Sequence, residues 1–310
     1  MTIPWWLLGA GAGIASALLL GVTPTNLLGA MLLSVLIPVP LFMAGLGLGT
    51  MAGAIAAAVA TLVVLVNHGP MIGMRFAGEF AAPVAILVRQ AMLSRTDDSG
   101  TEWFPAGLLT ATLSVIGLGF AIAISAIISS LAVQELFDER LRIFAENFAA
   151  GNEGITADTL LEWMEPIKRL LPGMTTVIWM VNLIAAGALA QAALVKLDRN
   201  LRPWPNFMAM ELPSWMVVVA TVPLAAAMVL PEPARTYALA MTFAACFAFL
   251  LQGLAVVHAF NRKIQGGTIL LVIFYVLVFG QGFPVVLLVL LGAVEQYAWV
   301  RRRWIEKTKE

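Results

Sequence analysis

Residues 1–74 contain no Asp, Glu, Lys or Arg, and this run constrains the fold more than any other feature of the sequence. Only 12% of the 310 residues are charged, whereas soluble domains carry about 25%. A helix needs about 20 consecutive apolar residues to cross the ~30 Å hydrocarbon core of a bilayer. Further charge-free runs of this kind cover residues 103–134, 170–195, 212–231, 236–261 and 264–294. The sequence therefore predicts an all-α, polytopic transmembrane helix bundle.

Turn-forming residues divide these runs into about ten spans. Prolines and glycines at 21–26 and 45–50 separate the first three spans. The last apolar block, 267–300, would extend ~50 Å as one helix, and Gly280-Gln-Gly-Phe-Pro284 can break it into two short helices. Nine spans, with this block as one tilted helix, is the alternative. The ten expected spans are 4–20, 25–45, 50–66, 80–93, 105–133, 174–195, 213–230, 237–260, 267–280 and 284–300.

Residues 134–172 follow a different pattern, in which charged residues surround an apolar stripe. The stripe has the spacing of one helix face, at Phe137, Leu141, Phe144 and Phe148. A turn at 151–154 precedes a second striped helix, which Pro166 is expected to kink. We expect one extramembrane amphipathic helical hairpin here, on the extracytoplasmic side.

The chain is thus expected to have four segments. Membrane helices at 1–133 and 173–300, with about five spans each, flank the 134–172 hairpin, and a basic tail follows at 301–310. With both termini in the cytoplasm, two thirds of the 18 Lys and Arg residues lie on the cytoplasmic side, which agrees with the positive-inside rule. The first span lacks the basic start of a cleaved signal and is expected to be retained. This predicts a multi-pass protein of the bacterial inner membrane.

Composition and motifs exclude several classes of function. A net charge of zero argues against nucleic acid as a partner. Cys246 is the only cysteine, and His68 and His258 fall at span ends on opposite sides, so no metal site is expected. The sequence has no His-Glu-x-x-His, Gly-x-Ser-x-Gly or phosphate-loop motif. We therefore expect no enzyme activity, no catalytic residues and no cofactor.

Arg75 and Glu79 are the first candidate binding residues. They are four residues apart, so on a helix they would face the same way and could pair. An ion pair at membrane depth would indicate function, because a central charge costs about 2.5–3.5 kcal/mol on the insertion scale. An anchor at the outer interface is the simpler interpretation, and the polar, glycine-rich residues 67–73 favour it.

Amide side chains within the spans are the other candidates. Asn182, Gln252 and Gln281 are the expected polar contacts of a ligand between helices, and Gln191 is a further amide of this kind. Hydrogen bonds between helices are the plain alternative, worth about 0.6 kcal/mol each. Gln281 has the better functional case because it sits at the predicted helix break, where irregular backbone usually lines a cavity.

From about residue 212 onward the sequence resembles the YybS-like family of bacterial membrane proteins of unassigned function. The resemblance is carried by Leu212-Pro-Ser-Trp215, Leu251-Gln-Gly-Leu-Ala-Val-Val-His258, Tyr275-Val-Leu277 and Leu290-Leu-Gly-Ala-Val-Glu295 with Trp299 and Arg301. The segment Gly45-Leu-Gly-Leu-Gly-Thr-Met-Ala-Gly-Ala-Ile-Ala-Ala-Ala58 is weakly similar to the substrate-specificity components of energy-coupling-factor transporters. Those components have about six spans, fewer than are expected here.

Two functions stay open at this stage. The first is small-molecule binding or transport through an intramembrane cavity. The second is a non-catalytic scaffold or assembly partner that docks another membrane protein through the 134–172 hairpin. The expected partners are accordingly the lipid bilayer and either a small-molecule substrate or another membrane protein.

Overall fold

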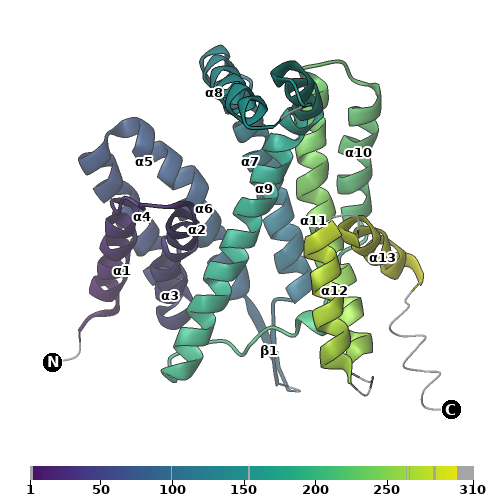
Figure 1. Cartoon of the computed structure of the whole chain (residues 1–310). Coiled ribbons are helices and arrows are strands. Elements are labelled where there is room, and N and C mark those ends of the chain that lie inside the picture. Colours follow the sequence, from purple (N-terminus) through teal and green to yellow (C-terminus); the bar gives the residue numbers. More distant parts are fainter. Residues whose placement is uncertain are drawn as a thin grey trace. The chain divides into compact units, whose positions relative to one another are not determined.

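The computed structural model describes residues 3–98, 100–152, 154–262, 264, 266–281 and 284–298. Within these ranges, Phe279 and Gln281 are described by their backbone alone. Its described part is mostly helical (Figure 1). The chain forms two compact units, which are described separately. Unit 1 comprises Met1–Leu113 and Trp179–Pro213, and unit 2 comprises Ser114–Ile178 and Ser214–Glu310.

Unit 1 is built around the N-terminal helices. Helix α4 packs against α1, α3 and α6, and α6 also packs against α3. Short strands β1 (Ser94–Asp97) and β2 (Gly100–Trp103) form an antiparallel hairpin after α6, between the spans expected at 80–93 and 105–133. The helices are α1 (Trp5–Leu20), α2 (Leu27–Leu36), α3 (Val39–Leu48), α4 (Thr50–His68), α5 (Pro70–Phe76), the π-helical turn η1 (Ala77–Ala81) and α6 (Ala82–Ala91).

The breaks between these helices have local chemical causes. Asn26 begins α2, because its side-chain oxygen accepts a hydrogen bond of 2.7 Å from the Gly29 N–H. Gly49 separates α3 from α4 with φ of 100°, a conformation that costs glycine little. The glycine-rich break that the sequence predicts at 45–50 is therefore confirmed.

The fourth membrane helix differs from its expected boundaries. The sequence places it at 80–93, whereas α5, η1 and α6 form one helical segment, Pro70–Ala91. Pro70 can start the helix because a backbone N–H in the first turn has no carbonyl partner within the helix. Proline, which lacks this N–H, therefore loses no hydrogen bond there. Arg75 and Glu79 consequently lie inside this helix, not before it.

Several connectors of unit 1 meet at one end. The Leu201 N–H donates to the Leu46 carbonyl at the end of α3 (3.2 Å), and Arg202 Nη1 donates to the Ala91 carbonyl at the end of α6 (2.7 Å). The Phe104 N–H, next to β2, donates to the Leu93 carbonyl (2.9 Å). We call this the connector end of unit 1.

Unit 2 holds the C-terminal helices. Helix α11 (Ala234–Asn261) packs against α10 (Met216–Val229) and α13 (Pro284–Ala298). A Cβ at Gly253 of α11 would collide with the Leu288 carbonyl, and one at Gly292 of α13 would collide with the Phe249 carbonyl. Only glycine therefore allows the two helices to approach this closely. The apolar block 267–300 contains two helices, α12 (Gly267–Gln281) and α13, as the ten-span interpretation predicts.

The amphipathic hairpin consists of α8 (Leu131–Ala150) and the first turns of α9 (Ala157–Lys196). Lys168 Nζ lies 2.6 Å from Asp138 Oδ1 and joins the two helices. Leu141 and Ala145 of α8 are buried. Pro166 and Pro172 do not end α9, which continues for 40 residues, so the second arm of the hairpin and the span expected at 174–195 are one helix.

The apolar helices match the expected number of spans. Within the described residues, six helical segments are long and apolar enough to cross a membrane, and four shorter apolar helices accompany them. The ten segments correspond one to one with the ten spans expected from sequence. The longer ones are Leu27–Leu48, Thr50–His68, Pro70–Ala91, Ala106–Ile128 (α7), Ala157–Lys196 and Ala234–Asn261, and the shorter ones are Trp5–Leu20, Met216–Val229, Gly267–Val278 and Pro284–Ala298.

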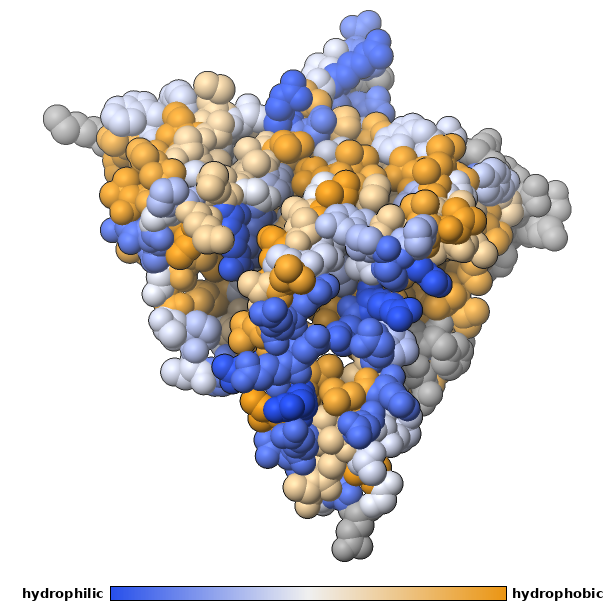
Figure 2. Space-filling view, turned by 90° about the horizontal axis from the view of Figure 1, so that it is seen from above, coloured by the Kyte–Doolittle hydropathy of each residue, from blue (hydrophilic) through white to orange (hydrophobic). Residues whose placement is uncertain are grey.

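Large apolar side chains cover much of the surface. Leu62 is 60% exposed, Val66 72% and Met71 82%, values that suit contact with lipid rather than water. Figure 2 shows many apolar residues at the surface seen from above, with hydrophilic residues in several places among them. The division into segments 1–133, 134–172, 173–300 and 301–310 concerns membrane topology and stays a prediction, and 301–310 lies outside the described residues.

Close packing of α1 on α4 generates a stability prediction. A Cβ at Gly13 would collide with the Ala56 backbone, whereas one at Gly11 would meet nothing within 4 Å. Gly13→Val should therefore destabilise unit 1 by about 1–3 kcal/mol, the usual cost of overpacking. The midpoint of thermal unfolding in detergent should fall for Gly13→Val and stay near the wild-type value for the matched Gly11→Val. Equal midpoints would contradict the α1–α4 contact.

Candidate functional site

Arg75 and Glu79 form an ion pair on one helical segment. Arg75 Nε lies 2.9 Å from Glu79 Oε2, and the Arg75 side chain is 76% exposed while that of Glu79 is 22% exposed. Pairing at this spacing is the outcome that the sequence predicts. The exposure of Arg75 makes the pair weak as a source of stability.

The backbone at Glu79 is also unusual. It lies in the π-helical turn η1, and position 83, whose N–H would bond the Glu79 carbonyl in an α-helix, is proline. The Trp179 indole N–H of α9 donates to this carbonyl at 2.8 Å. The irregular backbone therefore gains a partner from another helix, as membrane helices with proline require.

Asn182 lies near the same region of unit 1. Its Nδ2 donates to Ser34 Oγ of α2 at 3.1 Å. A cavity of about 250 Å³ borders Ser34, Arg75 and Glu79, and apolar residues complete its wall: Leu20, Val22, Pro24, Ala30, Leu33, Ile37, Ile72, Phe76 and Phe80. The structure thus brings Arg75 and Glu79 to one cavity and places Asn182 behind it, bonded to a lining residue.

The remaining predicted residues belong to unit 2. Gln252 of α11 is 1% exposed, and its Nε2 lies 3.4 Å from Gln296 Oε1 of α13, a long hydrogen bond between helices. The Gln252 Oε1 atom has no hydrogen-bond partner among the described residues. Gln281 ends α12, and its side chain lies outside the described part of the structure.

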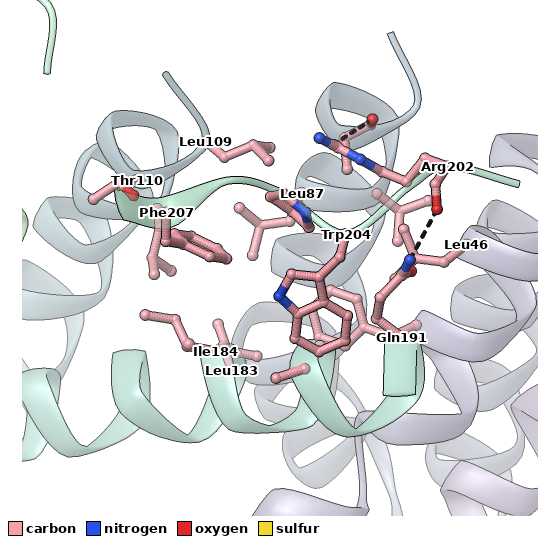
Figure 3. A pocket seen from close by; sticks show the side chains of 17 residues that line it. Leu46, Leu87, Leu109, Thr110, Leu183, Ile184, Gln191, Arg202, Trp204 and Phe207 are labelled. Carbon is pink, nitrogen blue, oxygen red and sulfur yellow. Dashed lines mark hydrogen bonds between the residues drawn. The ribbon is translucent and has the colours of Figure 1, made fainter. Parts of the chain in front are cut away.

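A second cavity, of about 150 Å³, lies at the connector end of unit 1 (Figure 3). Its wall is almost entirely apolar and combines helices α3, α6, α7 and α9 with the connector after α9. The lining residues are Phe42, Leu46, Leu87, Val88, Ala91, Leu109, Thr110, Leu113, Leu183, Ile184, Gly187, Ala188, Gln191, Arg202, Trp204, Pro205 and Phe207. We call this space the connector-end cavity.

Arg202 is a buried cation in the wall of this cavity. It is only 4% exposed, and its Nη1 and Nη2 donate to the carbonyls of Ala91 (2.7 Å) and Phe104 (3.4 Å). Its guanidinium carbon lies 5.7 Å from the centroid of the Trp103 ring. Burial lowers the pKa of Arg202, but a guanidinium stays protonated in proteins. Within the described residues it forms no ion pair, and its Nε has no hydrogen-bond partner.

Gln191 of α9 places an acceptor in the same wall. It is 5% exposed, and its Nε2 donates to the Arg202 carbonyl at 2.9 Å. That bond determines which way the amide faces, because the reverse orientation would oppose two oxygens. Gln191 Oε1 is left without a partner in the described part of the chain. Figure 3 shows the Gln191–Arg202 hydrogen bond, with the Trp204 ring near Leu183 and Ile184.

Two residues that line the connector-end cavity, Arg202 and Gln191, each keep a buried polar atom without a partner in the described part of the chain. An unsatisfied buried polar group costs about 1–3 kcal/mol, so one donor and one acceptor left open beside an apolar space favour a ligand that supplies both partners. The described residues contain no group of three His, Cys, Asp or Glu side chains that could hold a metal ion. The lining also has no nucleophile paired with a base.

Sequence reasoning missed this cavity for identifiable reasons. Arg202 counted only as a cytoplasmic charge, and Gln191 only as one of several amides within spans. The available signal was the segment Leu201-Arg-Pro-Trp-Pro205, in which one cation stands among apolar and ring side chains. No local pattern, however, relates that segment to the Ala91 carbonyl.

These features define a multi-pass α-helical membrane protein with internal cavities. The chain belongs to the family described as predicted membrane protein (DUF2232), whose model matches residues 14–294. No curated protein and no solved structure matches the chain.

The Asn182–Ser34 contact can be measured in a double-mutant cycle. Asn182→Ala, Ser34→Ala and the double variant should show a coupling free energy of about 0.6 kcal/mol, the average for such bonds in membranes. Unfolding of the purified protein in a titration with sodium dodecyl sulfate gives the required stabilities. Additive effects, with no coupling, would contradict a bond between α2 and α9.

Proposed function

We propose that this protein binds a small molecule in the connector-end cavity of unit 1 and that transport is the purpose of this binding. The observation that carries the proposal is an apolar cavity lined by Arg202 and Gln191, each of which keeps one buried polar atom without a partner among the described residues. Ligand sites in proteins typically have this character, an apolar lining with few polar groups that orient the ligand. The volume, about 150 Å³, suits a group the size of benzene or a short alkyl chain.

The cavity wall also supports a role in transport. Arg202, Trp204 and Pro205 border both the connector-end cavity and a more polar cavity of about 360 Å³ lined by Glu102, Asn206 and Glu211. These residues thus separate an apolar space from a polar one. The Arg75–Glu79 cavity, bordered by the 21–26 turn and α5, provides a further polar space in unit 1. We propose no catalytic step, since no reactive set lines these spaces.

A cavity-filling variant tests binding. A photoreactive six-carbon alkyl diazirine should label α9 peptides that contain Leu183 and Ile184, as mass spectrometry of the digested protein would show. Ala188→Phe should reduce this labelling severalfold because Ala188 lines the cavity. Leu189→Phe is the matched control, since Leu189 is 49% exposed and outside the lining. Labelling that is equal in both variants, or uniform along all apolar helices, would refute the proposed site.

A scaffold function is the second candidate, and exposed aromatic residues on α8 favour it. Phe144 is 52% and Phe148 39% exposed, and their rings lie 6.1 Å apart. A partner membrane protein could cover this face. The scaffold proposal is supported if replacing both Phe144 and Phe148 with serine releases a co-purifying membrane protein while diazirine labelling of α9 is unchanged. It fails if the double serine variant retains the same partners as the wild type.

We also propose that the protein resides in the bacterial inner membrane with both termini cytoplasmic. The distribution of basic residues supports this orientation. In a Cys246→Ser background, cysteine at Thr96 of β1 should be protected from an impermeant maleimide in intact cells, whereas cysteine at Glu146 of α8 should react. Both side chains are exposed, so burial does not explain a difference. The reverse labelling pattern would invert the topology.

A further inference from the structure

We propose that the ligand of the connector-end cavity is an amphiphile whose anionic head also carries a hydrogen-bond donor, with a short alkyl phosphate as the simplest example. This inference rests on the proposed binding function and adds the chemical class of the ligand. The head would lie at Arg202 and Gln191, and the apolar part would lie against Leu87, Leu183 and Ile184.

The charge of the head follows from Arg202. A buried cation without a counter-charge is costly, since backbone carbonyls and a ring face replace only part of its hydration. Arg202 is 4% exposed and forms no ion pair with any carboxylate in the described ranges. Its free Nε–H can donate to an anionic oxygen, and such charge-assisted bonds are roughly twice as strong as neutral ones.

The donor on the head follows from Gln191. Its Oε1 is fixed as the free atom of the amide, because Nε2 is already bonded to the Arg202 carbonyl. A fully ionised carboxylate offers no donor and would leave this oxygen open. A singly charged phosphate monoester carries anionic oxygen as well as one O–H. The anionic oxygen can accept from Arg202 Nε, and the O–H can donate to Gln191 Oε1.

The apolar part follows from the rest of the wall. Apolar side chains supply most of the lining, and Thr110 already donates its hydroxyl to Met210 Sδ at 3.1 Å. A free inorganic phosphate would leave this surface uncovered. Glu102 and Glu211 border the neighbouring polar cavity, so an anionic head is disfavoured on that side of Arg202.

The test compares two probes that share a six-carbon chain, hexyl phosphate and 1-hexanol. Each is titrated calorimetrically into the full chain in nanodiscs of zwitterionic lipid, at pH 6, where about half of the phosphate monoester keeps its O–H. Hexyl phosphate should bind at least tenfold more tightly than hexanol, the factor expected for one charge-assisted hydrogen bond. Inorganic phosphate alone should bind more weakly than hexyl phosphate.

Three variants locate the head. Arg202→Gln should remove the tenfold preference for the phosphate, and Gln191→Leu should reduce it, whereas Arg199→Gln should keep it. Arg199 is the matched control because it is an exposed cation on the same connector. If Arg202→Gln does not fold, the comparison of probes on the wild type and on Gln191→Leu still decides the question.

The outcomes separate this inference from the function on which it rests. Equal affinity for hexyl phosphate and hexanol, with diazirine labelling intact, overturns the anionic head and leaves the binding function standing. Loss of labelling and of all probe binding overturns both. A further arm identifies the source of the head group: phosphatidate added to the nanodiscs should compete with hexyl phosphate if the ligand is a membrane lipid, and should not compete if it is a soluble alkyl phosphate.

Discussion

The hydrocarbon core of the bilayer provides no hydrogen bonds, so each backbone N–H and C=O of a span must find a partner inside the protein. This constraint explains why apolar runs become helices and why the helix ends carry specific residues. Asn26 satisfies the start of α2, and Gly49 allows α3 to pass directly into α4. Where Pro83 withdraws an N–H, the Trp179 indole bonds the freed Glu79 carbonyl. At this break another helix supplies a partner for the irregular backbone.

Helices in a membrane gain little from burying apolar surface against each other, because lipid tails are equally apolar, and close van der Waals packing becomes decisive. Glycine makes that packing possible in both units. Gly13 brings α1 onto α4 in unit 1, and Gly253 with Gly292 brings α11 onto α13 in unit 2. At each of these positions a Cβ would meet backbone, which cannot move aside as a flexible side chain can.

Polar groups are treated differently in the two cavities of unit 1. Around the Arg75–Glu79 cavity the charges pair with each other and Asn182 bonds Ser34, so the region is largely satisfied without a ligand. At the connector end, Arg202 donates to the carbonyls of Ala91 at the end of α6 and of Phe104 after β2, yet among the described residues its Nε and the Gln191 Oε1 have no partner. Arg202 therefore stabilises the connectors and also keeps a donor with which a ligand would form a new hydrogen bond. This difference directs the proposed function to Arg202 and Gln191.

The sequence by itself determined the class of the protein, the number of apolar helices and the amphipathic hairpin, because charge-free length, turn residues and helical spacing are local properties. It also predicted the Arg75–Glu79 pair, whose four-residue spacing is local too. It did not determine where α5 begins, that α9 continues through Pro166, or that 94–103 forms a β-hairpin, since packing overrides weak local preferences at these places. Only the tertiary structure decided that Arg202 reaches the Ala91 carbonyl, 111 positions away in the chain, and shares a cavity with Gln191. Contacts over such separations depend on how whole helices pack, and no short-range pattern encodes them.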